Sequence, residues 1–195
     1  MGSCFRILIL AAALALASCQ PEQPSFQSTD ITGADFGKAF RLADHNGKPR
    51  SLEDFSGKVV VMFFGFTHCP DVCPITLAEL AGAVKQLGPS GDKVQVLLVT
   101  VDPERDTPEL LAKYVTAFNP QFLALRGNVD ETARVAKEFK VIYQKVAGPR
   151  PENYAMDHSA GSYIFDRQGR LRLYVAYGRG ADVFAHDIDL LLKQP

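Results

Sequence analysis

Cys69 and Cys73, with three residues between them and a proline after each, are the first candidates for chemistry in this sequence. A pair of thiols serves disulfide exchange, a structural bridge or the binding of a soft metal ion. A disulfide across so short a loop constrains the unfolded chain little, because the entropy it removes grows with loop length. We therefore expect a functional pair, either a redox disulfide between Cys69 and Cys73 or a metal site.

Pro74 bears on where the cysteines lie. Proline disfavours helical geometry in the residue before it and suits the first position of a helix. We therefore expect a helix to begin at Pro74, with Cys73 as its N-cap and Cys69 in the preceding loop. The helix dipole would then stabilise a thiolate at Cys73. A thiolate acts both as the nucleophile in disulfide exchange and as a ligand for soft metals, so its stabilisation does not choose between the two uses. The loop is wider than that of a Cys-x-x-Cys motif, which favours a metal, with a disulfide as the alternative.

The elements around the cysteines alternate between strands and helices. Apolar runs predict strands over 58–66, 94–102, 122–127, 162–166 and 171–177, and helical periodicity predicts helices over 74–87, 108–118, 129–139 and 182–192. Thr107 is the expected N-cap of the second helix, with Pro108 at its first position. A hairpin over 40–52 turns at Asn46 and Gly47. This order matches a thioredoxin-like α/β fold, a central mixed β-sheet flanked by helices, with an additional N-terminal β-hairpin. Strand 58–66 delivers Cys69 to the carboxyl ends of the central strands, where such sheets place their sites.

The third candidate is His158, which we expect in the loop before strand 162–166. In a thioredoxin fold the corresponding loop faces the cysteines and normally carries a cis-proline, whereas residues 154–163 include no proline. Two thiolates and an imidazole suit copper, with zinc as the alternative. Asp157 is a candidate for orienting the imidazole, or a turn residue. Asp102 is a candidate for a place beside the site or for docking a partner, or a loop cap.

The N-terminus predicts an exported chain. An apolar run over 7–17 follows Arg6 and is too short to cross a bilayer, which takes about 20 residues. It ends in the letters LASC at Cys19, which resemble the lipobox of bacterial lipoproteins. The resemblance implies cleavage before Cys19 and acylation of that cysteine, with an ordinary secretory signal as the alternative. The expected location is the bacterial cell envelope, with the chain lipid-anchored on the extracytoplasmic side of a membrane.

Three segments follow from this interpretation. They are a lipoprotein signal peptide over 1–18, a lipid-anchored spacer over 19–35 and a thioredoxin-like domain over 36–195. Cys4 leaves with the signal and Cys19 carries lipid, so the pair at 69 and 73 holds the free thiols of the mature domain. The formal net charge of -1 shows no basic excess, so we expect no nucleic acid partner.

Three blocks of sequence resemble the Sco/SenC family: GFTHCPDVCP, VDPERDTP and DHSAGSYIFD. The resemblance covers about residues 36–192, and it implies a thioredoxin-fold copper chaperone for the dinuclear copper site of cytochrome c oxidase. It also implies that Cys69, Cys73 and His158 hold one copper ion per domain. The two thiolates suit Cu(I), and the added histidine lets the same site hold Cu(II). The implied transfer is by ligand exchange with the copper-site subunit of the oxidase. Another copper chaperone or a thiol reductase is a further candidate partner.

This interpretation describes a metal carrier and not an enzyme in the usual sense. A membrane-tethered thiol–disulfide oxidoreductase is one alternative, against which the wide cysteine spacing and the missing cis-proline count. A redox or copper sensor is another, since a sensor and a chaperone both need a reversible site and an exposed surface. We expect His68, next to Cys69, to point away from the metal, and we retain Met156 as a candidate neighbour of the site.

Overall fold

The computed structural model describes residues 25–148 and 153–194. The expected signal peptide over 1–18 and the expected lipidation site Cys19 lie outside the described residues. Among the helices of the described part, none is both long enough and apolar enough to cross a membrane.

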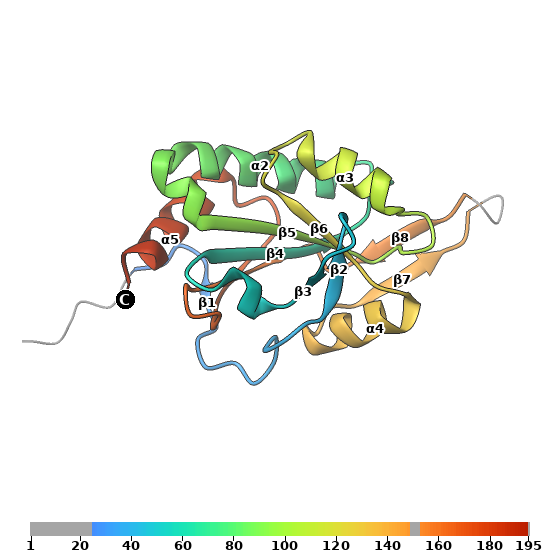
Figure 1. Ribbon diagram of the computed structural model, residues 1–195, viewed down its shortest axis with the longest axis horizontal. Coiled ribbons are helices and arrows are strands. Elements are labelled where there is room, and N and C mark those ends of the chain that lie inside the picture. The colour runs from blue at the N-terminus through green and yellow to red at the C-terminus, as the bar shows by residue number, and fades with distance from the viewer. Residues whose placement is uncertain (1–24, 149–152, 195) are drawn as a thin grey trace, which may run out of the picture.

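A mixed eight-stranded sheet forms the centre of the domain, in the order β1-β10-β9-β4-β5-β6-β2-β3 (Figure 1). Its strands are β1 (Thr29–Asp30), β2 (Leu42–Asp44), β3 (Pro49–Arg50), β4 (Val59–Gly65), β5 (Val94–Thr100), β6 (Leu123–Arg126), β9 (Ser162–Phe165) and β10 (Leu171–Val175). Strand β5 runs parallel to both β4 and β6, whereas β9 runs antiparallel to β4. The predicted α/β class with a mixed central sheet is confirmed.

Four helices and two 3-10 segments cover this sheet in the described residues. They are α2 (Val72–Gln86), α3 (Pro108–Thr116), α4 (Val129–Glu138) and α5 (Ala181–Lys193), with 3-10 turns at Leu52–Phe55 and Gly88–Lys93. Figure 1 shows α2 and α3 on one side of the sheet and α4 on the other. Helix α5 packs against α2. The layers leave the carboxyl end of β4 open at the start of α2, where the cysteines lie.

Local sequence explains the main elements. All seven residues of β4 and all seven of β5 are buried, because helices cover both faces of the sheet. Helix α3 begins as predicted, with the Thr107 side chain accepting a hydrogen bond from the Leu110 N–H and Pro108 at the first helical position. The hairpin predicted at Asn46 and Gly47 is also present, and its strand β2 pairs with β6, so the hairpin extends the sheet at one edge.

A separate two-stranded sheet stands beside the main sheet and was not predicted. Strands β7 (Tyr143–Val146) and β8 (Ala155–His158) pair antiparallel, with Tyr143 opposite His158, and lie to the right in Figure 1. We expected His158 in a loop, and it is instead the last residue of a strand. The hairpin escaped prediction because its strands are short and carry polar residues on their exposed faces.

The folded domain also begins before the predicted boundary at residue 36. Strand β1 pairs antiparallel with β10, and the backbone N–H groups of Gln27 and Ser28 donate to the buried Asp187 carboxylate, each at 2.9 Å. Residues 27–35, expected to belong to the spacer, are therefore attached to the domain. Two-residue strands carry no hydrophobic period, so the sequence pattern could not indicate β1.

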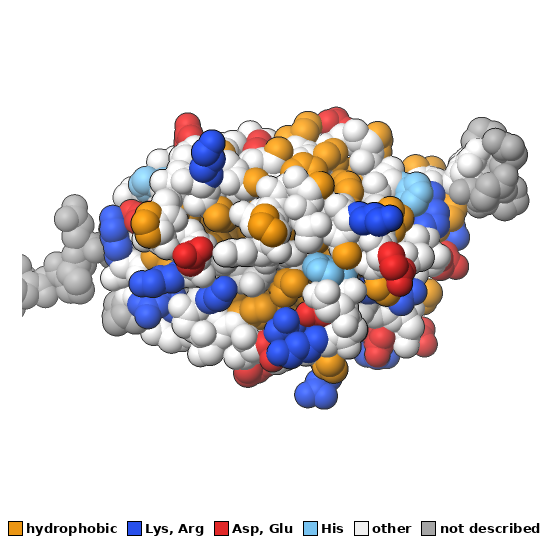
Figure 2. Space-filling view, turned by 45° about the horizontal axis from the view of Figure 1, so that its top comes forward, with side chains coloured by type: hydrophobic (Ala, Val, Ile, Leu, Met, Phe, Trp, Pro, Cys, Tyr) orange, Lys and Arg blue, Asp and Glu red, His pale blue; other side chains and the backbone are white. Residues whose placement is uncertain are grey.

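The surface carries both signs of charge. Figure 2 shows acidic and basic side chains interspersed, with hydrophobic side chains between them, on the face that it draws. This face therefore has no extended field of a single sign.

Candidate metal centre

Strand β4 ends at Gly65, and a six-residue loop leads from there to α2, which begins at Val72. Asp71 is the N-cap, so Cys73 is the second residue of the helix and not its N-cap as predicted. Pro74 is accommodated in the first turn because the N–H groups there have no helical acceptor, and its missing N–H therefore costs nothing. The preference of pre-proline residues for extended backbone does not prevail at Cys73.

The two thiols differ in their surroundings. Cys73 is fully buried, whereas Cys69 is partly exposed, and both are free. The Cys73 N–H donates to the Cys69 sulfur at 3.4 Å. Gly65 makes room for the buried thiol, because a Cβ atom at that position would lie 2.7 Å from Cys73 Sγ. The glycine at the end of β4 is thus a steric requirement of the site.

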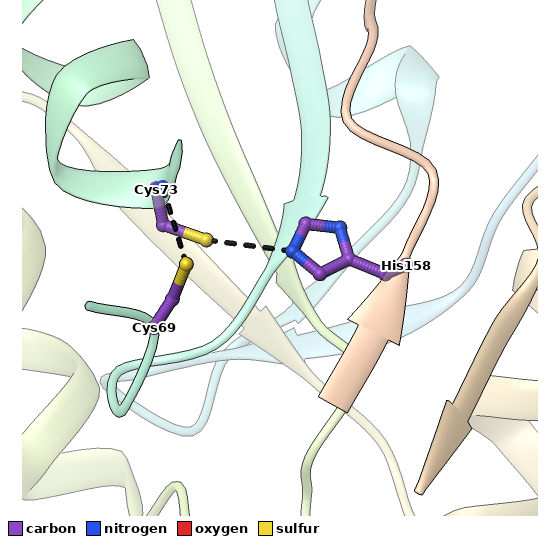
Figure 3. A group of neighbouring side chains, drawn as sticks. All are labelled: Cys69, Cys73 and His158. Carbon is purple, nitrogen blue, oxygen red and sulfur yellow. Dashed lines mark hydrogen bonds between the residues drawn. The ribbon is translucent and has the colours of Figure 1, made fainter. Parts of the chain in front are cut away.

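His158 approaches the thiols from the hairpin. Its Nε2 atom lies 3.7 Å from Cys73 Sγ, and Figure 3 shows the ring pointing at that sulfur from the end of β8. Its Nδ1 atom lies 3.0 Å from the Ser159 carbonyl oxygen, which can only accept, so Nδ1 carries the proton and Nε2 keeps its lone pair for the site. The Phe66 ring meets the imidazole edge to face at 5.8 Å. The packing and the carbonyl together fix the ring.

The three donor atoms of Cys69, Cys73 and His158 lie within 4.8 Å of one another. Bonds of about 2.0–2.3 Å to one metal ion would set tetrahedral donors about 3.3–3.8 Å apart. The distance between Cys73 Sγ and His158 Nε2 already falls in that range. The arrangement fits a metal ion of the soft or borderline class after small side-chain adjustments.

The pKa values of the two thiols diverge. A hydrogen bond from the Cys73 thiol, with backbone N–H groups and His158, lowers the pKa of Cys69 to about 5 despite partial burial. The same hydrogen bond to Cys69, followed by burial, raises the pKa of Cys73. The thiolate predicted at Cys73 therefore forms at Cys69. The hydrogen bond between the thiols favours the thiolate at Cys69, and burial adds to the cost of a thiolate at Cys73.

Three other residues were predicted as neighbours of the site: Asp102, Asp157 and Met156. Asp102 is buried and binds Arg105 and Tyr154, so in the described structure it contacts none of the three donors directly. Asp157, a candidate for orienting the imidazole or a turn residue, is exposed on the opposite face of β8 from His158. The Ser159 carbonyl is the group that contacts the His158 ring nitrogen. Met156 shares the inward face of β8 with His158.

His68 points away from the metal centre, as predicted. Its side chain is half exposed, and its Nδ1 atom lies 3.1 Å from Thr67 Oγ1. The imidazole lies outside the group formed by the two thiols and His158.

Asp106 is a residue of the site that sequence reasoning missed. It is fully buried and accepts hydrogen bonds from the N–H and hydroxyl of Thr67 and from the Thr100 hydroxyl. Burial raises the pKa of its carboxyl. Thr67 lies two residues before Cys69, so this carboxyl holds the start of the cysteine loop. Asp106 belongs to the quoted block VDPERDTP, but its partner stands 39 residues away and no local pattern indicates it.

Comparisons with known proteins agree with this geometry. The SCO1/SenC family profile matches residues 28–193. A mitochondrial SCO2 homolog of Bos taurus is 42% identical over 147 residues, which cover 73% of this chain and 54% of the relative. This chain thus spans about half the length of the mammalian relatives that it matches.

Two solved structures share both fold and sequence. The ScoI protein of Bradyrhizobium japonicum, solved with copper bound, is 38% identical with a TM-score of 0.72, over 82% of this chain and 100% of that one. The apo Sco1 protein of Thermus thermophilus is also 38% identical, with a TM-score of 0.78, over 88% of this chain and 100% of that one. These likenesses confirm the thioredoxin-like fold.

Proposed function

The chain belongs to the SCO1/SenC family, and from this premise we propose that it is an extracytoplasmic metallochaperone that delivers copper to the dinuclear copper site of cytochrome c oxidase. Solved Sco proteins hold copper, and the Sco family is described as one of cytochrome c oxidase assembly proteins. The observation that carries the proposal is the meeting of Cys69, Cys73 and His158, whose donor atoms lie within 4.8 Å of one another. Two thiolates and an imidazole are a donor set that suits copper.

Each ligand has a distinct part in this proposal. The two thiolates bind Cu(I), and the imidazole Nε2 completes the site for Cu(II), with one copper ion per domain. Copper displaces a proton from Cys73, which is protonated in the free site, and Cys73 recovers that proton when copper leaves. A ligand of the partner enters at the exposed side, beside Cys69, and copper passes to it by exchange of ligands.

The setting of this activity is also proposed. The signal peptide over 1–18 would direct export and then be removed, and a lipid on Cys19 would hold the domain outside the cytoplasmic membrane of a bacterium. The copper-site subunit of the oxidase is the recipient, and another copper chaperone or a thiol reductase serves the site before transfer. In this function the protein carries copper and does not turn over a substrate as an enzyme does.

One observation favours a second candidate function, thiol–disulfide exchange. The Cys69 thiolate is partly exposed beside the protonated Cys73, which is the arrangement of a nucleophilic thiol with a resolving thiol. The Cys69 thiolate would attack a partner disulfide, releasing one partner thiolate and forming a mixed disulfide. Cys73, after losing its proton, would then release the second partner thiolate and leave a disulfide between Cys69 and Cys73.

Anaerobic copper titration of the full-length protein tests the first proposal. We expect one Cu(I) per wild-type chain, and loss of tight binding in Cys69→Ser. A wild-type protein that takes up no copper with both thiols reduced would contradict it. Disulfide-reductase turnover that persists in His158→Ala and in the presence of a copper chelator would favour the second candidate instead.

A further inference from the structure

The metal centre is assembled from two sheets that share no ladder. Both cysteines follow β4 of the main sheet, whereas His158 ends β8 of the separate hairpin. Something must fix the hairpin against the main domain, or the imidazole would not be held at a set distance from the thiols. Apart from the contacts of His158 with the thiols and with the adjacent Ser159, the hydrogen bonds and ion pairs that join strands β7 and β8 and Tyr154 to the rest of the described structure all reach one segment. That segment is the turn after β5, residues 102–106.

The turn Asp102–Asp106 holds the hairpin through its contacts with Tyr154. The Tyr154 hydroxyl donates to Asp102 at 2.7 Å, and Arg105 Nη1 donates to the Tyr154 carbonyl at 2.8 Å. The Arg105 guanidinium also stacks on the Tyr154 ring, 3.6 Å from its centroid, and its Nε atom pairs with Asp102. Tyr154 is thus held by its hydroxyl, its ring and its backbone at once.

The same turn grips the cysteine loop from its other end. The buried Asp106 carboxyl holds the N–H and hydroxyl of Thr67, and the Asp106 N–H donates to the Asp102 carbonyl at 3.0 Å, which closes the turn. Val101, just before the turn, donates its N–H to Gly65 at 2.9 Å, in continuation of the main sheet. The turn is therefore rigidly attached to the segment that carries Cys69.

Strand geometry connects Tyr154 with His158. Side chains alternate between the two faces of a strand, so residues 154, 156 and 158 share one face. The burial pattern agrees, since Tyr154, Met156 and His158 are partly buried while residues 155 and 157 are exposed. Met156 packs against the hydrophobic core and, with Val101 and Pro103, lines a cavity of about 430 Å³. Tyr154 fixes one end of the strand, and His158 stands about 13 Å away at the other.

We propose that the Asp102–Asp106 turn is a bridge that sets the position of His158 relative to the two thiols, with Tyr154 as the positioning residue on the hairpin. This inference rests on the proposed function. Releasing Tyr154 frees the imidazole and leaves the cysteine loop attached through Asp106. The change therefore weakens the three-ligand Cu(II) form and spares the two-thiolate Cu(I) form.

The test is Tyr154→Phe in the full-length protein, which removes only the hydroxyl that donates to Asp102. We expect the Cu(II) affinity to fall about 10–100-fold, which is the range found when groups that orient metal ligands are lost. We also expect the thiolate-to-copper charge-transfer band of the Cu(II) form to weaken. Cu(I) affinity should stay at the wild-type value. The matched control is Tyr163→Phe, which removes a core hydroxyl that donates to the Phe139 carbonyl at 2.8 Å and makes no hydrogen bond with the Asp102–Asp106 turn in the described structure. It should leave both affinities unchanged.

Hydrogen exchange of the copper-free protein is the second readout. Tyr154→Phe should speed exchange of the β7 and β8 amides and not of β4 or β5, and Arg105→Lys, which loses the stacked fork of donors, should do the same. A Cu(II) affinity equal to that of wild type in Tyr154→Phe would overturn the inference, as would equal losses of Cu(I) and Cu(II). Absence of copper uptake by the wild-type protein would refute the proposed function instead. Hydrogen exchange of the β7 and β8 amides would then decide whether the turn holds the hairpin.

Discussion

Cys73 Sγ lies 3.7 Å from His158 Nε2, although 85 residues separate the two in the chain. The sulfur is fully buried in the first turn of α2, and the nitrogen comes from the end of an outlying hairpin. The pair therefore joins the two halves of the molecule at the metal centre. The Cys73 sulfur occupies the space that a side chain at position 65 would fill. The His158 imidazole is held by its hydrogen bond to the Ser159 carbonyl.

Replacing His158 by alanine should separate the two copper states. The thiolates remain, so Cu(I) binding persists, whereas Cu(II) loses its nitrogen ligand and its affinity falls by more than about 100-fold, beyond the usual effect of an orienting group. Competition titrations with chelators of known affinity measure both. His68→Ala is the control, because that imidazole adjoins Cys69 but lies outside the donor group. An equal loss of Cu(II) in both variants would contradict the assignment.

Gly65→Ala should damage the site through the buried sulfur. The new methyl group would lie 2.7 Å from Cys73 Sγ and 3.0 Å from Leu98 Cδ1, so one of them must move. We expect the free energy of unfolding to fall by about 1–3 kcal/mol and Cu(I) affinity to fall with it. Urea unfolding and Cu(I) competition measure the two effects. Gly82→Ala, whose methyl would approach Ala181 at 3.1 Å far from any thiol, should leave copper affinity intact.

Copper binding should depend on pH in two steps. The pKa of Cys69 is about 5 and that of Cys73 is raised, so at pH 7 the free site holds one proton on Cys73. Cu(I) binding then releases one proton, and affinity falls about tenfold per unit as pH drops towards 5. Below that pH Cys69 is protonated as well, so the release rises towards two protons and the fall steepens to about a hundredfold per unit.

The His158→Ala variant suits this measurement, because Cys69 and Cys73 are then the donors of the group that remain. Calorimetry in buffers of different ionisation enthalpy counts the protons directly. Release of two protons at pH 7 would show that both thiols are protonated in the free protein. Release of none would show that both are already thiolates. Either result would contradict the asymmetry of the pair.

Asp187→Ala should destabilise the domain by releasing residues 27–30. The buried carboxylate accepts the N–H groups of Gln27 and Ser28, which would be left without that acceptor, and we expect a loss of about 1–3 kcal/mol in urea unfolding. Asp189→Ala removes an exposed acid that pairs with Lys193 on the same helix, and it should cost less than about 1 kcal/mol. Equal stability of the two variants would restore the predicted domain boundary at residue 36.

The sequence indicated the framework because its elements are strongly patterned. Strand β4 is a continuous apolar run, β5 is largely apolar, and Thr107 caps α3 directly before Pro108, so the places of these elements follow from local rules. The hairpin of β7 and β8 has short polar strands, and β1 has two residues, so neither has enough buried positions to produce a period. These elements exist because tertiary contacts hold them.

The candidate site divides in the same way. Cys69, Cys73 and His158 were found from residue chemistry and resemblance. The thiolate was predicted at Cys73, whereas the pKa of Cys69 is the one that is lowered, by hydrogen bonds that exist only in the folded chain. Asp106 and Tyr154 could not be assigned, because their partners stand 39 and 52 residues away in the chain. Supporting residues of this kind become visible only once the chain is folded.

The separation of the donors also bears on how the protein matures. An unfolded chain brings copper two thiols that are close in sequence, but the imidazole comes within reach only after β4, β5 and β9 have paired and the hairpin has closed. These are long-range pairings, which form late because their loops must close first. A metal that binds only the native state then stabilises it by mass action. Only the folded domain therefore presents all three donors together, so the proposed Cu(II) form depends on completed folding, whereas the two thiols are close to each other before it.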